Sequence, residues 1–134
     1  MFVLCPKCWC ELIAVPAACP NCGAHLYLYS REYQRQLVAA LPRSGIKRRV
    51  QISEVLGSRG KRSAVPALVE LLHDPDVPVR VAALGGLAEI GDRSAIAAVE
   101  KLTSDEDLAV RTVARKVLKA LGAHVSGTSR RSAR

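Results

Sequence analysis

Four cysteines near the start of the chain have the type and spacing of metal ligands. Cys5 and Cys8 form one Cys-x-x-Cys pair, and Cys19 and Cys22 form a second pair after a spacer of ten residues. The two residues inside each pair let the backbone fold around a metal ion while its amide hydrogens face the sulfurs. Four thiolates can close a tetrahedral cage, which leaves no open position for a substrate or a water molecule. The spacing therefore predicts a structural metal site, with Zn²⁺ as the expected ion.

The sequence leaves two other states of this four-sulfur site open. One is iron in a rubredoxin-like cage, and the other is a pair of reactive or disulfide-forming dithiols without metal. All five cysteines of the chain lie at or before Cys22, and the first residues lack the basic lead and long apolar core of a secretion signal. That combination favours metal ligation over disulfides. Cys10 and His25 are expected to be spare, and Cys10 is expected to point away from the metal.

The residues around the cysteines predict a small β-structured head, residues 1–30. The alternating pattern of Ala24–Tyr29 predicts a strand, which we expect to pair with Trp9–Ala14. The head resembles a zinc ribbon, although Trp9 follows Cys8 where a glycine is usual. The resemblance implies that the metal folds the head. About thirty residues bury too little surface to hold themselves together, whereas structural zinc contributes on the order of 10 kcal/mol or more.

After the head, the sequence repeats itself with a period of 31 residues. The stretch Arg62–Asp92 is followed at once by a second copy, Arg93–Gly122. Periods of this length indicate stacked units that cannot bury their apolar faces alone. The matched positions are Ser63 and Ser94, Val65 and Ile96, Leu68 and Val99, Leu71 and Leu102, Asp74 and Asp105, Arg80 and Arg111, Leu87 and Leu118, and Gly91 and Gly122.

A third, degenerate copy precedes the two clear ones, so three units are expected, at residues 32–62, 63–93 and 94–124. Each unit should form two helices, because apolar residues recur at helical spacing on either side of a break. In the first unit the helices are expected at Tyr33–Leu41 and Ile46–Leu56. In the middle unit, Asp76 is expected to cap the second helix, and the buried stripe of that helix should be Val79, Ala82, Ala83, Leu87 and Ile90.

The units resemble the HEAT repeat, in particular the short variety of the phycobilisome lyases. The resemblance rests on a first helix, a tight turn with Asp74, Arg80 early in the second helix and a closing Gly91. It implies an all-α solenoid of three helical hairpins behind the zinc-ribbon β head. It also implies a ladder between neighbouring units, in which Arg49, Arg80 and Arg111 pair with Asp74, Asp76 or Asp105.

Positive charge is concentrated in the first unit and at the end of the chain. The net charge is +8, but residues 32–62 carry eight Lys and Arg against two Asp and Glu, whereas residues 63–93 carry two against five. Residues 125–134 add three arginines without periodicity and are expected to form a disordered basic tail. Exposed cations can contact phosphates or an acidic partner, and the residues expected to do so are Lys47, Arg48, Arg59, Lys61 and Arg62.

A stack of helix pairs offers a surface suited to another protein, so a non-catalytic protein–protein interaction scaffold is the main functional prediction. Nucleic-acid binding through the head and the first unit is the alternative, and an accessory or lyase-like role in chromophore attachment is a second one.

His25, His73 and His124 lie in different units with no evident nucleophile beside them, so no enzyme activity or small-molecule substrate is expected. The chain has no run of eighteen apolar residues that would predict a membrane span, and a cytoplasmic location is expected.

Overall fold

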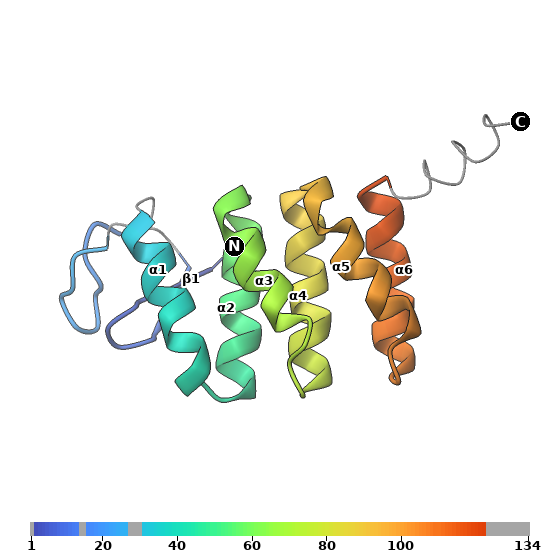
Figure 1. Cartoon of the computed structure of the whole chain (residues 1–134). Coiled ribbons are helices and arrows are strands. Elements are labelled where there is room, and N and C mark those ends of the chain that lie inside the picture. Colours follow the sequence, from blue (N-terminus) through green and yellow to red (C-terminus); the bar gives the residue numbers. More distant parts are fainter. Residues whose placement is uncertain (1, 14–15, 27–30, 123–134) are drawn as a thin grey trace, which may run out of the picture.

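The computed structural model describes residues 2–13, 16–26 and 31–122, and within them a row of helical hairpins follows a small β head (Figure 1). The β head contains a two-stranded antiparallel sheet, in which Val3 pairs with Leu12 and Leu4 with Glu11. The strands are β1 (Val3–Leu4) and β2 (Glu11–Leu12), and the helices are α1 (Arg31–Ala40), α2 (Ile46–Ser58), α3 (Val65–Leu71), α4 (Val77–Ile90), α5 (Ile96–Lys101) and α6 (Leu108–Ala120).

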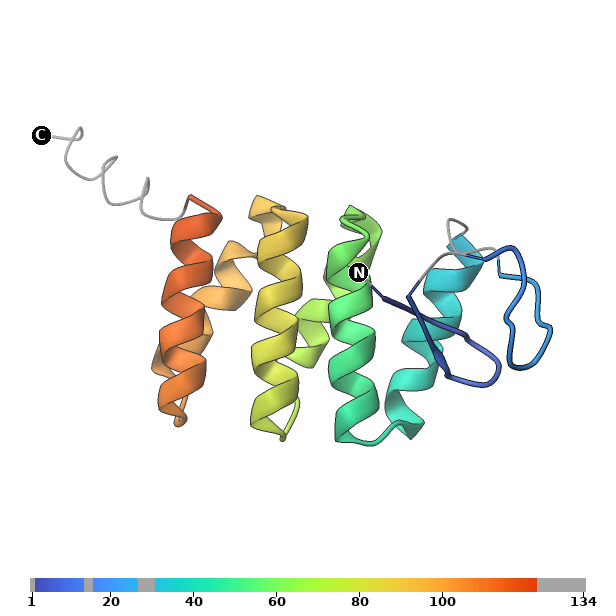
Figure 2. The same ribbon diagram turned by 180° about the vertical axis from the view of Figure 1, so that it is seen from behind.

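The helices form two layers. The first helices of the hairpins, α1, α3 and α5, lie on one side of the stack, and the second helices, α2, α4 and α6, lie side by side on the other (Figures 1 and 2). The prediction of an all-α solenoid of three units behind a β head is therefore confirmed. The helices of the first unit begin and end within two residues of their predicted bounds. The predicted tail, residues 125–134, lies outside the described residues.

The core follows the 31-residue period. Leu37, Leu68 and Val99 occupy the same place in successive first helices, and all three are fully buried. The predicted stripe of α4 is confirmed at Val79, Ala83 and Leu87 and is only half-buried at Ala82 and Ile90. Leu84 is also fully buried, which the stripe did not predict. Helix α4 contacts α2 on one side and α6 on the other, so it buries a wider arc than one stripe.

Two glycines set the distance between α2 and α4. A Cβ atom at Gly57 would lie 2.4 Å from the Cα of Gly86, far inside van der Waals contact. A Cβ at Gly86 would in turn meet the carbonyl oxygen of Ser53 at 3.1 Å. Gly85, the next residue, has open space at the Cβ position. The two backbones can approach this closely only because neither Gly57 nor Gly86 has a side chain.

The predicted ladder between units is confirmed for two arginines. The Nε of Arg49 lies 2.9 Å from Oδ2 of Asp74 in the next unit, a close charge contact that is not aligned as a hydrogen bond. One unit further on, Nη2 of Arg80 donates to Oδ1 of Asp105 at 3.2 Å. Among the described residues, Arg111 in the last unit donates only to backbone carbonyls of its own unit. The ladder therefore joins the first unit to the second and the second to the third.

Asp76 does not cap α4 with its side chain, so that prediction was wrong. It occupies the N-cap position, but its carboxylate accepts a hydrogen bond from Arg49 of the preceding unit. The equivalent Asp107 does cap α6, where it accepts from the amides of Ala109 and Val110. An arginine of the neighbouring unit thus takes the carboxylate that the helix amides would otherwise use.

Arg80→Ala should destabilise the stack more than Arg111→Ala. Both substitutions remove hydrogen bonds to the carbonyls that precede the helix, a loss of about 1 kcal/mol. Arg80→Ala also leaves Asp105, whose side chain is only 9% exposed, without its cation, so a total loss of about 2 to 3 kcal/mol is expected. Urea unfolding followed by circular dichroism measures both. Equal losses in the two variants would show that the ladder contributes nothing.

Candidate metal centre

The two Cys-x-x-Cys pairs fold into two knuckles with the same backbone hydrogen bonds. In the first knuckle the amide of Trp9 donates to the carbonyl of Cys5 at 2.8 Å, and the amide of Cys5 donates to the carbonyl of Cys10 at 3.0 Å. In the second, Gly23 donates to Cys19 and Cys19 to Ala24, both at 2.8 Å. Each knuckle therefore presents its two sulfurs in the same way.

The four predicted ligands come together. The sulfurs of Cys5, Cys8, Cys19 and Cys22 all lie within 4.8 Å of one another. The Cys5 and Cys22 sulfurs are 3.6 Å apart, and so are those of Cys8 and Cys19. A zinc–sulfur bond of about 2.3 Å gives a tetrahedron with sulfur–sulfur edges of about 3.8 Å. The four sulfurs therefore fit around one metal ion without a change of fold.

Trp9 adopts the backbone conformation that a glycine would adopt more easily. Its φ angle is +64°, close to the +73° of Gly23 at the same place in the second knuckle. A non-glycine residue in the left-handed region costs about 1 to 2 kcal/mol. The guanidinium of Arg48 lies over the Trp9 ring, 4.9 Å from its centre, and this cation–π contact offsets part of the cost.

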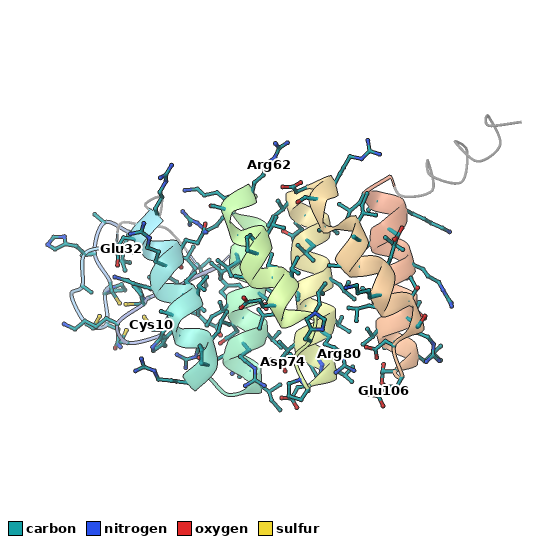
Figure 3. The ribbon with its side chains drawn as sticks, viewed as in Figure 1. Cys10, Glu32, Arg62, Asp74, Arg80 and Glu106 are labelled. Carbon is teal, nitrogen blue, oxygen red and sulfur yellow. The ribbon has the colours of Figure 1, made fainter. Side chains whose placement is uncertain are left out.

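The fifth cysteine points toward the cage, so the prediction that it points away was wrong. The Cys10 sulfur lies 3.3 Å from the sulfurs of both Cys8 and Cys19, and Figure 3 shows it among the sulfur atoms of the head. Strand β2 begins only at Glu11, so Cys10 still belongs to the knuckle, at the place that Ala24 occupies in the other one. The left-handed turn at Trp9 directly precedes it.

The neighbouring groups divide the thiols into those that ionise readily and those that do not. A hydrogen bond from the side chain of Asn21 lowers the pKa of Cys8 to about 5. Contact with the Cys8 thiol raises the pKa of Cys10 to about 12. A metal ion needs thiolates, so the low pKa of Cys8 suits a ligand. A hydrogen bond with the backbone of Ala24 lowers the pKa of Cys22, but burial and the neighbouring thiols raise it to about 11, so the pKa values alone do not separate every ligand from Cys10.

Cys10→Ser should keep the metal ion, whereas Cys22→Ser should lose it. The second knuckle has alanine at the place of Cys10 and needs no thiol there. The Cys22 sulfur faces that of Cys5, whereas Cys10 lies beside Cys8 and Cys19, so Cys10 is not placed to complete the cage when Cys22 is lost. The two side chains are similarly exposed, which makes them a matched pair. Native mass spectrometry gives the number of ions on each chain. A metal-free Cys10→Ser chain would mean that the fifth thiol is a ligand.

The strand pairing of the head differs from the prediction. Glu11 and Leu12 pair with β1, and His25 forms an isolated bridge with Ala18. The predicted pairing of Ala24–Tyr29 with Trp9–Ala14 is therefore wrong where both segments are described, and residues 14 and 27–29 lie outside the described residues. Each knuckle pairs the two segments that flank it, because its tight turn places those segments next to each other.

Tyr33 fixes the head to the first helical hairpin. Its hydroxyl donates to the carbonyl of Leu4 at 2.9 Å and accepts from the amide of Leu4 at 3.2 Å. Burial raises the pKa of Tyr33, so the hydroxyl keeps the proton that it donates. Leu4 is fully buried, and one side chain thus satisfies both backbone groups of a β1 residue. This contact joins the candidate metal centre to the helical stack.

A comparison with protein-family models matches residues 35–123, about two thirds of the chain, to HEAT repeats. The chain belongs to the HEAT-repeat family. The match is to HEAT repeats in general and does not separate the phycobilisome-lyase type from the others. A comparison with curated proteins finds no match. Within the described ranges, none of the helices is long and apolar enough to cross a membrane.

The five predicted contact residues divide into separate places on the first HEAT repeat. Lys47 and Arg48 line a cleft beside the head. Lys61 and Arg62 line a smaller hollow of about 510 Å³ near the other end of α2. Arg59 lies over the ring of Tyr33 in α1, 5.0 Å from its centre, and so contacts the other helix of its own repeat. The length of α2 separates Lys47 and Arg48, in its first turn, from the other three residues, which follow its last residue, Ser58.

Tyr33→Phe should loosen the head without disturbing the later HEAT repeats. The change leaves the buried amide and carbonyl of Leu4 without partners, which costs about 1 to 3 kcal/mol. Hydrogen exchange should become faster at Leu4 and Leu12, while the amides of α4 keep their protection and serve as the internal control. Faster exchange to the same extent along the whole chain would contradict a local role for this hydroxyl.

Proposed function

We propose that this chain is a non-catalytic scaffold for protein–protein interaction, with a structural Zn²⁺ ion in its head. The observation that carries the proposal is the layer of second helices. In the three HEAT repeats α2, α4 and α6 lie next to one another and keep one face outward (Figure 2). A partner can therefore contact equivalent positions of all three repeats at once, which is how repeat proteins use their extended surfaces.

The composition of this outward face suits a protein partner. The outward positions of α4 include four uncharged residues: Pro78 is exposed, and Val81, Ala82 and Gly85 are half-buried. A helix with so few charges is ordinarily covered on all sides. Charged residues stand on the flanking helices, among them Glu54 on α2 and Lys116 on α6. An apolar centre with a polar border is typical of protein interfaces.

Zinc is the ion that best suits the head. The four sulfurs fit a tetrahedral site that is closed by protein ligands. The ion supplies charge and four bonds that hold the two knuckles together, and it needs no redox partner. The role of the chain's own residues is to present thiolates, with Asn21 helping to keep Cys8 ionised, and to connect the cage to the stack through Tyr33.

Site-specific photo-crosslinking in the native cell tests the scaffold. A photoreactive residue is placed at Glu89 or Thr112, which are exposed on the second helices, or at Glu70 or Ala97, which are exposed on the first helices. The proposal expects protein adducts at Glu89 and Thr112 that survive nuclease treatment, and few adducts at the two control positions. Adducts that disappear with nuclease would favour the nucleic-acid alternative. Equal labelling at all four positions would contradict a binding face.

A further inference from the structure

A cleft of about 810 Å³ lies between the head and the first HEAT repeat. Its lining includes Trp9 of the first knuckle, Arg43 of the turn after α1, and Lys47 and Arg48 of the first turn of α2. Among the described residues, none that lines the cleft is acidic. Neither Arg43 nor Lys47 has an ion pair in the described part of the chain, and both are exposed. The cleft is therefore positively charged and has one aromatic wall.

At one position of the repeat, the first repeat carries a positive charge in this cleft, whereas the two later repeats carry a negative charge. Arg43 stands 31 residues before Asp74 and 62 before Asp105. Those aspartates accept an arginine from the preceding repeat. The first repeat has the head before it in place of another repeat, and it carries a cation at the position of the acceptor. A carboxylate that enters the cleft would pair with Arg43. The repeat would then supply the cation and the ligand the anion, which is the reverse of the ladder.

The first turn of α2 retains positive charge that the fold does not neutralise. Lys47, Arg48 and Arg49 stand together at the positive end of the helix dipole, and the turn has no acidic residue. Cations there are unfavourable by some tenths of a kcal/mol each. Asp74 and Asp76 neutralise Arg49, and Arg48 lies on Trp9. The positive charges of Lys47 and Arg43 are not neutralised in this way. An anionic ligand that lies between these two side chains would remove their mutual repulsion.

We propose that this cleft binds an acidic peptide segment of the partner protein, with its carboxylates on Arg43 and Lys47 and its neighbouring residues against Trp9. The inference rests on the proposed scaffold function and names one of its contacts. A peptide fits better than a nucleic acid because the cations do not continue as a track. Glu54 follows Lys47 two turns later on α2, and the second basic hollow lies near the opposite end of the helix, whereas a nucleic-acid groove follows the backbone over many phosphates.

Trp9 is the only tryptophan of the chain, so its fluorescence reports on this cleft. The metal-loaded full chain is titrated with a synthetic peptide of glutamates spaced by glycine and serine, with the same peptide carrying glutamines, and with a short single-stranded oligo-dT. The double variant Arg43→Glu/Lys47→Glu tests the cleft. Its matched control, Arg31→Glu/Arg35→Glu, makes the same change of charge at the other end of α1, beside the second hollow.

We expect saturable binding of the glutamate peptide and none of the glutamine peptide. Binding should weaken at least about tenfold in the cleft variant, because like charges oppose association, and should change less than about twofold in the control. No binding of the glutamate peptide, or equal weakening in both variants, would overturn the proposal. Tighter binding of oligo-dT would overturn it in favour of nucleic acid. If a partner crosslinks to Glu89 and Thr112 equally well in the cleft variant, the scaffold function is supported, but the proposal that the cleft binds this partner is overturned.

Discussion

Cys5→Ser should unfold the head and leave most of the helical stack in place. Cys5 is fully buried, and its sulfur faces that of Cys22 across the cage. The remaining thiols of the cage cannot close a four-sulfur site, and the head then loses the stabilisation that a structural ion gives, on the order of 10 kcal/mol. So short a segment buries too little surface to keep Val3, Leu4 and Leu12 in their buried places without the ion, and the Tyr33 contact with Leu4 is expected to be too weak to replace it.

Three signals measure this result together. Native mass spectrometry should show a chain without metal, Trp9 emission should shift to the red as the knuckle opens, and far-ultraviolet circular dichroism should keep most of its helical signal. The unsubstituted chain treated with a chelator should behave in the same way. A Cys5→Ser chain that keeps both its ion and its Trp9 emission would show that the cage does not build the head.

Gly57→Ala should separate the first two repeats, and Gly85→Ala should stabilise the chain. The methyl group at position 57 would lie 2.4 Å from the Cα of Gly86, so α2 and α4 must move apart. Overpacking of this kind costs about 3 kcal/mol or more when backbone is the obstacle. At position 85 the methyl group meets nothing, and alanine is favoured over glycine in a helix by about 1 kcal/mol.

The two glycine variants make the same chemical change, and only their surroundings differ. Urea unfolding curves should therefore shift in opposite directions relative to the unsubstituted chain. If both variants are stabilised, then α2 and α4 do not cross as closely as described. If both are destabilised, the α4 face that carries Gly85 is covered within the chain. The outward position of Gly85 also makes Gly85→Ala a test for the scaffold, since a partner that approaches this face closely should bind that variant less well.

The repeat architecture could be predicted because its evidence is local and periodic. Leu37, Leu68 and Val99 recur at the same place in successive repeats and are buried there. The arginine ladder was implied by the resemblance to HEAT repeats, and Arg49 and Arg80, which stand in equivalent places, contact acidic residues of the next repeat. The four ligands were predictable because a Cys-x-x-Cys pair determines its own local geometry.

The features that were missed depend on contacts between distant residues or on competition for one group. Nothing in the spacing brings the Tyr33 hydroxyl to Leu4 or the Arg48 guanidinium to Trp9. Asp76 has the residue type and the position of a helix cap, but its carboxylate accepts a hydrogen bond from Arg49 of the preceding repeat instead. Cys10 was expected to lie in a strand, and the left-handed turn just before it keeps it beside the other sulfurs.

Native mass spectrometry of the full chain, before and after acidification, will decide whether a metal ion held by four cysteines builds the head of this HEAT-repeat protein. We expect one added mass per chain that corresponds to a single zinc ion and is lost in acid, when the thiolates are protonated. A chain that carries no ion and whose cysteines are joined in two disulfides would contradict this expectation.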